Sequence, residues 1–205
     1  MKARANGASQ ADYCVLQISK VRMNPYVRLL QEALIGVGID CSLADGLSPR
    51  LARSWKFDVL HLHWLELLYA SPHLGRSLRR LVAVLTGLVW TKARGAKVVY
   101  TVHNLNPHEQ AFPLLNRIAN RAVFAMADAL HVHGEEARRA VARTYGRRDG
   151  VYVIPHGGYI GAYPNNCTRR EARGRLGLAD DAFVYLSLGQ VRHYKGIEDL
   201  VAAFG

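Results

Sequence analysis

The strongest constraint in this sequence is a regular alternation of short strand-like runs with longer helix-like segments. Six runs are rich in apolar, β-branched or aromatic residues, a composition that favours buried strands. They span residues 13–19, 39–43, 57–64, 98–102, 129–132 and 151–154. The segments between them carry apolar residues at helical spacing, and the longest predicted helix runs from Ser71 to about Lys92. This order predicts an α/β fold with a parallel, doubly wound sheet.

The composition is that of a folded protein from a reducing compartment. Half of the 205 residues are apolar, so the chain can bury a sizeable core. The cysteines, Cys14, Cys41 and Cys167, form no CxxC pattern, which argues against a disulfide framework and favours a cytoplasmic location. The N-terminal residues 1–12 lack the apolar run of a secretory signal, and the longest apolar run, 81–90, is too short to span a bilayer.

The charge of the chain is strongly positive and unevenly distributed. The net charge is +11, which favours phosphates, nucleic acids or anionic lipids as partners. Residues 67–108 contain no Asp or Glu, although six Lys and Arg residues lie there. The sequence therefore predicts an anionic partner without choosing among these classes.

The C-terminal part of the chain predicts a second, incomplete domain. Residues 157–168 are dense in Gly, Pro and Asn, which indicates a linker. A predicted helix (169–176), strand (183–188), loop (189–196) and second helix (197–204) follow. One strand and two short helices cannot bury a core alone, so a second α/β domain continues beyond Gly205 or these residues pack onto the first. We divide the chain into a Rossmann-like domain, 1–164, and a linker with the start of a second Rossmann-like domain, 165–205.

Histidines gather where the predicted strands end. His61, His63, His103, His131, His133 and His156 each lie at or near such an end. Because the carboxyl ends of parallel strands share one edge of a sheet, we expect these side chains to line one polar cleft. Pairs of the form HxH can also ligate zinc, but no carboxylate completes an obvious ligand set, so we expect neither a metal nor another cofactor.

The loop between Gly189 and Gly196 suits a diphosphate. Gly189 lets a ligand approach the backbone, and Arg192 and Lys195 supply positive charge. Gly196 opens a helix whose amino end favours anions. Basic loops on protein surfaces are also commonly only solvated, and the loop alone does not decide between the two.

The run FVYLSLGQVRHYKGIEDLVAAF resembles the start of the second domain of GT-B glycosyltransferases, particularly family 4 and its relatives. The usual pattern there is a hydrophobic strand, then Gly-Arg, then Lys-Gly, then a helix. Upstream, DVLHLHW, VVYTVHN, ADALHVHGEEAR and VYVIPHG fit the order of that family's first domain, so the resemblance covers nearly the whole chain. NPY, HLHW, TVHNLNPHE and PHGGY are closest to exopolysaccharide-type transferases, some of which are β-mannosyltransferases.

This resemblance implies transfer of a hexose from a UDP- or GDP-sugar to a lipid-linked or polysaccharide acceptor. Gly189, Arg192 and Lys195 would hold the donor diphosphate and stabilise the negative charge that develops as it leaves. His103 matches the family histidine near the donor sugar. The residues expected on the acceptor side are Asn24, Tyr26, His61, His63, Trp64 and Glu109.

The sequence departs from the family pattern in three places. The first βα loop, SKVRMNPY, lacks the common Gly-Gly pair, and Gln190 stands where many relatives have Arg. The family's Glu-x7-Glu segment, which helps to hold the donor, would lie beyond Gly205, so we expect this chain to be inactive alone. An inverting reaction would need a general base, for which Glu109 and Glu66 are candidates; in a retaining reaction His103 would only position the substrate.

Other functions stay open at this point. A sugar-nucleotide epimerase of GT-B architecture would also place histidines and carboxylates in the cleft. A non-catalytic basic module is disfavoured, and no nucleic acid partner is expected, because the basic residues lack aromatic interleaving or a recognisable motif. The segment 74–94 is either an ordinary helix of the domain or a basic amphipathic helix that contacts the anionic inner face of the plasma membrane.

Overall fold

The computed structural model describes residues 13–105, 112–189, 191–192 and 195–204. The chain separates into two compact units, Met1–Tyr159 and Ile160–Gly205. The first unit carries the sheet, and the second contains two short helices joined by extended chain.

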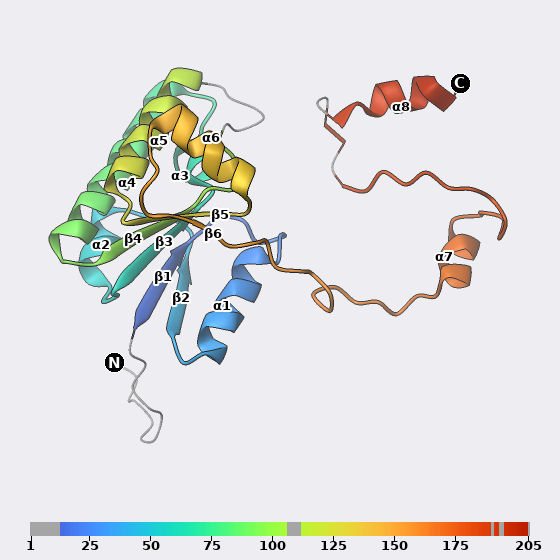
Figure 1. The fold of residues 1–205 in the computed structure, drawn as a ribbon, viewed down its shortest axis with the longest axis horizontal. Helices are drawn as coiled ribbons and strands as arrows, with labels where there is room; N and C mark the ends of the chain where they lie inside the picture. Colours follow the sequence, from blue (N-terminus) through green and yellow to red (C-terminus); the bar gives the residue numbers. More distant parts are fainter. Residues whose placement is uncertain (1–12, 106–111, 190, 193–194, 205) are drawn as a thin grey trace. The chain divides into compact units, whose positions relative to one another are not determined.

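The first unit is built on a six-stranded parallel sheet, which confirms the predicted fold class (Figure 1). Its strands are β1 (Cys14–Ile18), β2 (Asp40–Ala44), β3 (Val59–His63), β4 (Lys97–Thr101), β5 (Ala129–Val132) and β6 (Val151–Val153). Their order in the sheet is β2-β1-β3-β4-β5-β6, and every neighbouring pair is parallel. The direction of the crossovers reverses at β1, so the sheet is doubly wound.

Helices cover the two faces of the sheet unequally. The helices of this unit are α1 (Tyr26–Gly36), α2 (Pro49–Ser54), α3 (Leu65–Tyr69), α4 (Leu74–Ala93), α5 (Pro113–Met126) and α6 (Glu135–Tyr145). The large core cluster takes buried side chains from α2 to α6, whereas the buried residues of α1 lie outside it. Figure 1 shows α1 on one side of the sheet and α4 on the other.

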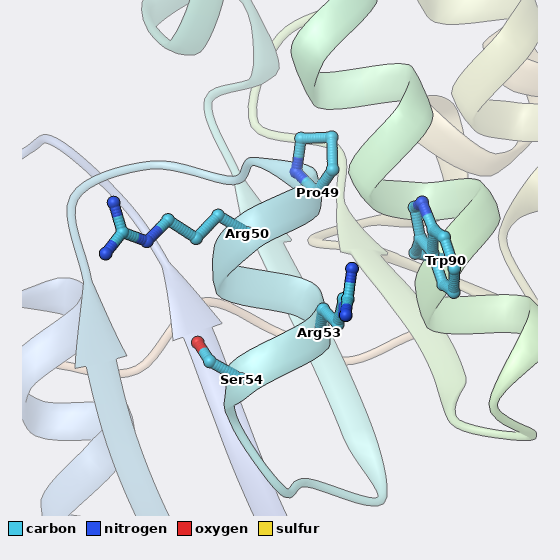
Figure 2. Close-up of a pocket in the computed structure, with 5 residues that line it drawn as sticks. All are labelled: Pro49, Arg50, Arg53, Ser54 and Trp90. Carbon is cyan, nitrogen blue, oxygen red and sulfur yellow. The ribbon is translucent and has the colours of Figure 1, made fainter.

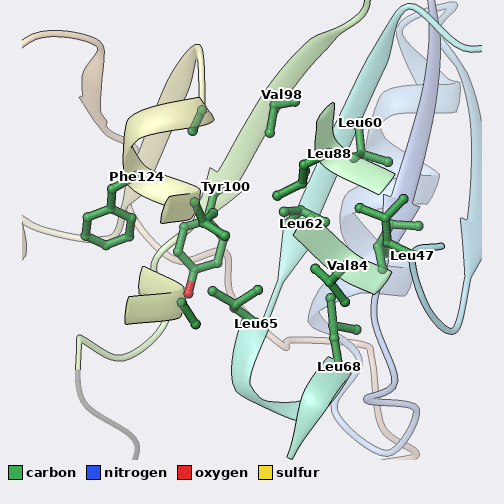
Figure 3. Close-up of a cluster of buried hydrophobic side chains, with 14 of the residues drawn as sticks. Leu47, Leu60, Leu62, Leu65, Leu68, Val84, Leu88, Val98, Tyr100 and Phe124 are labelled. Carbon is green, nitrogen blue, oxygen red and sulfur yellow. The ribbon is translucent and has the colours of Figure 1, made fainter. Parts of the chain in front are cut away.

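The strands show the two-residue period that separates these faces. On β3, Leu60 and Leu62 point into the core cluster, and Val84 and Leu88 of α4 lie over them (Figure 3). The residues between and after them, including His61, point to the opposite face. The same alternation continues on β4 and β5, so one face of the sheet is apolar and the other carries polar side chains toward the carboxyl ends of the strands.

Two local features differ from the sequence prediction in this unit. Helix α3 was not anticipated; it begins directly after β3 and buries Leu65, Leu68 and Tyr69 in the core. Helix α4 begins at Leu74 and not at Ser71, where the Ser71 hydroxyl instead accepts a hydrogen bond from the backbone N of His73.

The second unit contains α7 (Arg169–Arg175) and α8 (Ile197–Phe204). The predicted helix over 169–176 is confirmed, and Thr168 and Glu171 form a capping box that begins it. The predicted strand over 183–188 is wrong, because these residues form no strand in the structure. A strand needs a neighbour with which to exchange backbone hydrogen bonds, and no segment of the described second unit pairs with this one.

The packing of α4 against the chain before α2 generates a stability prediction. At Gly87, a Cβ atom would lie 2.8 Å from the Leu47 Cγ and 3.2 Å from the Ser48 carbonyl carbon. We expect Gly87→Ala to destabilise the fold by about 1–3 kcal/mol, because Leu47 is buried and has no room to move. Gly75→Ala in the same helix meets no atom within 4 Å, so its free energy of unfolding should rise by up to about 1 kcal/mol. Urea unfolding of both variants checks this, and equal effects would contradict the packing argument.

Candidate functional site

The polar face of the sheet carries a row of hydrogen-bonded side chains near its carboxyl edge. His131 Nε2 lies 2.9 Å from the carbonyl oxygen of Ile154, and a carbonyl can only accept, so this nitrogen donates. His131 Nδ1 then accepts from the Thr101 hydroxyl at 3.2 Å, and the Thr101 oxygen accepts from His61 Nε2 at 2.7 Å. When both rings are neutral, this series of hydrogen bonds fixes which nitrogen carries the proton in each histidine.

A second layer of rings lies at the ends of the strands, around Tyr26. The Tyr26 ring, at the first residue of α1, contacts four imidazoles and the Trp64 indole, with ring centroids 4.8–6.2 Å apart. Those imidazoles belong to His63, His103, His133 and His156. Burial raises the pKa of Tyr26 to about 12, and a hydrogen bond with Thr101 offsets part of that rise. The phenol therefore remains protonated at neutral pH.

Asn24 and Tyr159 fix the start of α1 against the segment after β6. The Asn24 Oδ1 accepts from the backbone N of Tyr26 at 2.9 Å and from the Tyr159 hydroxyl at 2.6 Å. Tyr159 also lies within hydrogen-bond distance of His156 Nε2, at 3.2 Å. Asn24 thus contributes to the site by holding Tyr26 in place as well as by its own amide.

Trp64 holds His103 through an unusual backbone conformation. Trp64 has a φ of 43°, and it is the only non-glycine residue with positive φ in the described part of the chain. This left-handed conformation costs an L-residue about 1–2 kcal/mol. It places the indole parallel to the His103 ring, with centroids 3.7 Å apart and an interplanar angle of 5°. His103 Nε2 also lies 3.3 Å from His63 Nδ1, so both the ring plane and one edge of His103 are defined.

Five imidazoles at this edge of the sheet have a lowered pKa, which favours their neutral form. Burial, together with repulsion from neighbouring histidines, lowers the pKa of His61 and of His103 to about 3. The same causes lower the pKa of His63 well below its ordinary range, and lower the pKa of His131 and His133. These five rings therefore offer neutral donors and acceptors.

Two of these rings have buried nitrogens without a partner. His63 Nε2 and His133 Nε2 make no hydrogen bond to any described residue. His133 Nδ1 donates to the Ile154 carbonyl at 3.4 Å, so its Nε2 carries an unused lone pair. An unsatisfied buried polar atom costs about 1–3 kcal/mol, and a ligand hydroxyl could satisfy it.

A hollow of about 240 Å³ adjoins the cluster. Tyr26, His131, Ile154 and Tyr159 line it together with apolar side chains of α1. It combines an apolar wall with a few polar groups, which is typical of small-ligand sites. Within the described residues, no group of three or more His, Cys, Asp or Glu side chains has an arrangement that could hold a metal ion.

The structure brings together the predicted residues of the first unit that it describes. Asn24, Tyr26, His61, His63, Trp64 and His103 all lie in this cluster. Glu109 lies outside the described residues. Glu66, the other candidate base, interacts electrostatically with Tyr69 and Tyr100 of the core. Burial raises the pKa of its carboxyl group.

Sequence reasoning did not identify Thr101 and Tyr159 as site residues. Thr101 is the last residue of β4, two positions before His103, and its place at the end of the strand was the available signal. Tyr159 follows His156-Gly157-Gly158, but its contact with Asn24 spans 135 positions and leaves no local pattern.

The predicted diphosphate residues lie in the second unit. Gly189 has a φ of +121°, and a Cβ atom there would come within 2.9 Å of Lys195 Nζ, so glycine admits the ammonium group to the backbone. The backbone N of Lys195 donates to the Arg192 carbonyl at 3.0 Å. The loop therefore places these residues side by side, and their binding of a diphosphate stays a prediction.

Comparison with known proteins identifies the relatives of this chain. It is 30% identical over 186 residues to the GDP-mannose:glycolipid 4-beta-D-mannosyltransferase of Xanthomonas campestris pv. campestris, covering 87% of this chain and 45% of the relative. It is 30% identical over 158 residues to the D-inositol 3-phosphate glycosyltransferase 1 of Catenulispora acidiphila, covering 72% of this chain and 33% of the relative. Over most of its length this chain is therefore similar to glycosyltransferases.

The homology confirms the resemblance seen in the sequence motifs. The chain spans less than half the length of these glycosyltransferases. No protein-family model matches it. A solved structure that carries a yeast Spc42 trimeric coiled coil aligns over 96% of both chains with a TM-score of 0.39 and 10% identity, which is too weak to bear on the fold.

The neutral histidines generate a prediction about pH. In the unfolded state His61 binds a proton below about pH 6.5, whereas in the folded state it does so only near pH 3. As the pH falls from 6.5 toward 3, the unfolded state therefore gains a proton that the folded state does not, and the free energy of unfolding decreases. Between pH 7 and pH 5, His61 alone should remove about 2 kcal/mol of the free energy of unfolding. We expect His61→Gln to reduce the pH dependence measured by urea unfolding. Leu62→Val, a neighbouring loss of apolar packing, should lower stability equally at both pH values.

Proposed function

We propose that the protein is a glycosyltransferase that moves mannose from GDP-mannose to a glycolipid acceptor. The observation that carries this proposal is the 30% sequence identity with the Xanthomonas mannosyltransferase over 87% of this chain. The first unit would bind the acceptor, and the Gly189–Gly196 loop would contribute to the donor site of a longer protein. Because the chain spans only 45% of that relative, we expect the 205 residues alone to bind the acceptor and not to transfer the sugar.

The histidine cluster supports binding of neutral hydroxyl groups. His63 Nε2 and His133 Nε2 have no described partner, and a sugar hydroxyl can both donate to and accept from such nitrogens. The low pKa of His103 makes its imidazole a weak proton acceptor, which favours positioning of the donor sugar over general base catalysis. Trp64 would keep the His103 ring at a fixed angle during this step.

A pair of basic residues and one carboxylate would carry the chemistry. Arg192 and Lys195 would stabilise the diphosphate as the sugar leaves, which is an electrostatic role. A β-mannoside formed from the α-linked donor requires inversion and hence a base. Glu109 is the carboxylate that we propose for it, since Glu66 lies with the core tyrosines.

The transfer reaction tests this assignment. We would join the chain to the C-terminal half of the Xanthomonas relative and measure transfer of radiolabelled mannose from GDP-mannose to extracted glycolipid. We expect His103→Ala and Lys195→Ala each to lower kcat/KM by about 100-fold or more, because each removes a contact at the reacting centre. His73→Ala, on the exposed start of α4, serves as the control and should retain activity.

Undiminished transfer in both site variants would overturn the residue assignment. Interconversion of free sugar nucleotides without any acceptor would instead favour the epimerase alternative.

We also propose that α4 contacts the membrane in which a glycolipid acceptor would lie. Its exposed side carries large apolar residues that are about half exposed: Leu74, Leu78, Val82 and Val89. Arg76, Arg79 and Arg80 lie in its first two turns, and no Asp or Glu occurs in residues 67–108. Exposed apolar and basic side chains on one helix are typical of contact with an anionic bilayer surface. No helix in the described ranges is long and apolar enough to cross a membrane.

Vesicle binding tests the membrane contact. We expect Arg76→Gln/Arg79→Gln/Arg80→Gln to weaken binding to anionic vesicles at least tenfold, since each basic residue near the surface contributes about 1 kcal/mol. Arg138→Gln/Arg139→Gln/Arg143→Gln on α6 removes the same charge elsewhere and is the matched control. Equal loss in both triple variants would mean that only net charge matters, and that α4 has no special role.

A further inference from the structure

A second hollow, of about 430 Å³, lies between α2 and the last turns of α4. Pro49, Arg50, Arg53 and Ser54 of α2 line it, with Trp90 of α4. Figure 2 shows Arg53 in the gap beside Trp90, whereas Arg50 extends from the other side of the α2 turn. The volume falls within the range of ligand pockets, and the hollow shares no lining residue with the histidine cluster.

The walls of this hollow are fixed before any ligand arrives. The Ser48 hydroxyl caps α2 by accepting from the backbone N of Leu51 at 3.2 Å. At the other end, the Arg94 guanidinium donates to the carbonyl oxygens of Ala52, Arg53 and Trp55. Gly87 lets α4 approach the start of α2 closely. Helix α2 is therefore held at both ends against α4, which reduces the cost of ordering a binding site.

The hollow carries positive charge that nothing nearby neutralises. Within the described residues, the guanidinium groups of Arg50 and Arg53 have no hydrogen-bond or ion-pair partner. The two chain segments that build the walls contain no Asp or Glu, since residues 46–57 and 67–108 lack both. Guanidinium groups bind phosphate oxygens with paired hydrogen bonds, so the expected ligand carries a phosphate group.

The surroundings of the hollow indicate what the phosphate is attached to. The Trp90 indole is 42% exposed and offers a flat apolar surface with one N–H donor. Val89 is 57% exposed beside it, and the exposed apolar side chains of α4 continue toward Leu74. Trp residues with Arg at an apolar surface are typical of the level of lipid headgroups.

We propose that the α2–α4 hollow binds the phosphate of an anionic lipid headgroup, with Arg53 holding the phosphate oxygens beside Trp90, Arg50 adding positive charge at the edge of the hollow, and Trp90 packing against the organic part. The choice of a lipid as the source rests on the proposed membrane contact of α4. The phosphate site itself does not, because a soluble phosphate ester carries the same group. This site is separate from the proposed acceptor site, and it adds a preference for phosphate to a contact that would otherwise depend on charge alone.

A soluble ester tests the phosphate site without a membrane. In the wild-type chain, titration with glycerol 3-phosphate should shift the indole N–H signal of Trp90 in a saturable way, whereas glycerol should not. Trp90→Phe assigns that signal among the three tryptophans. We expect Arg50→Gln/Arg53→Gln to weaken binding about tenfold or more, because the charge-assisted contact of Arg53 and the nearby charge of Arg50 are lost. Arg138→Gln/Arg139→Gln, which removes the same charge from α6, should leave the affinity within about twofold.

Vesicles then distinguish a lipid headgroup from a soluble ester. Neutral galactolipid vesicles are doped with phosphatidic acid or, to the same surface charge, with oleate. For a lipid phosphate site, the Arg50→Gln/Arg53→Gln variant loses about tenfold in binding to phosphatidic acid and no more than the α6 control in binding to oleate. Thermal unfolding confirms that the variants are folded.

Each result supports or overturns a stated part of the proposal. An unmoved Trp90 signal, or equal losses in the α2 and α6 variants, would overturn the phosphate site. A Trp90 shift with glycerol 3-phosphate but no preference for phosphatidic acid over oleate would overturn the lipid assignment. Vesicle binding that is unchanged by the α4 triple substitution would overturn the membrane contact. A saturable shift of the Trp90 signal would still support the phosphate site in that case.

Discussion

The two-residue period of the parallel strands is the constraint on which the first unit depends. On β5, Leu130 and Val132 enter the core while His131 and His133 face the other way. The same phase holds on β3 and β4, and the parallel register then brings Thr101 beside His131. A slip of one residue in any of these strands would place imidazoles in the core and leucines in the polar layer, so the apolar pattern also fixes the site.

Burial of this polar layer determines its chemistry. Desolvation disfavours a charged imidazole, and neighbouring imidazoles disfavour that charge further. His63 and His103 are therefore neutral and act as hydrogen-bond partners. The hydrogen-bonded row from His61 to Ile154 is internally satisfied, whereas the open nitrogens of His63 and His133 lie in the layer around Tyr26. The large positive charge of the chain lies elsewhere, on helices such as α4 and α2. The layer of histidines and the basic helices are therefore different surfaces of the first unit.

The sequence predicts those parts of the structure that depend on local pattern. Runs of Val, Ile, Leu and Tyr predicted the strands of the sheet. The gathering of histidines followed from parallel topology alone. The left-handed Trp64 could not be predicted, because no glycine or asparagine marks that position and only the stack on His103 accounts for it. The apolar run 183–188 reads as a strand, but strand formation depends on a pairing partner and not on composition.

The length and direction of α4 relate the two surfaces of the first unit. Its 20 residues span about 30 Å, from the end of α3 near the carboxyl edge of the sheet to the amino end of β4. Arg76, Arg79 and Arg80 therefore lie toward the histidine edge, and Trp90 lies toward the opposite edge. A lipid held at the α2–α4 hollow would be too distant to present its own headgroup to His103. Such a lipid could only orient the protein on the bilayer, and the first turns of α4 would then bring the histidine edge to a different lipid, the acceptor.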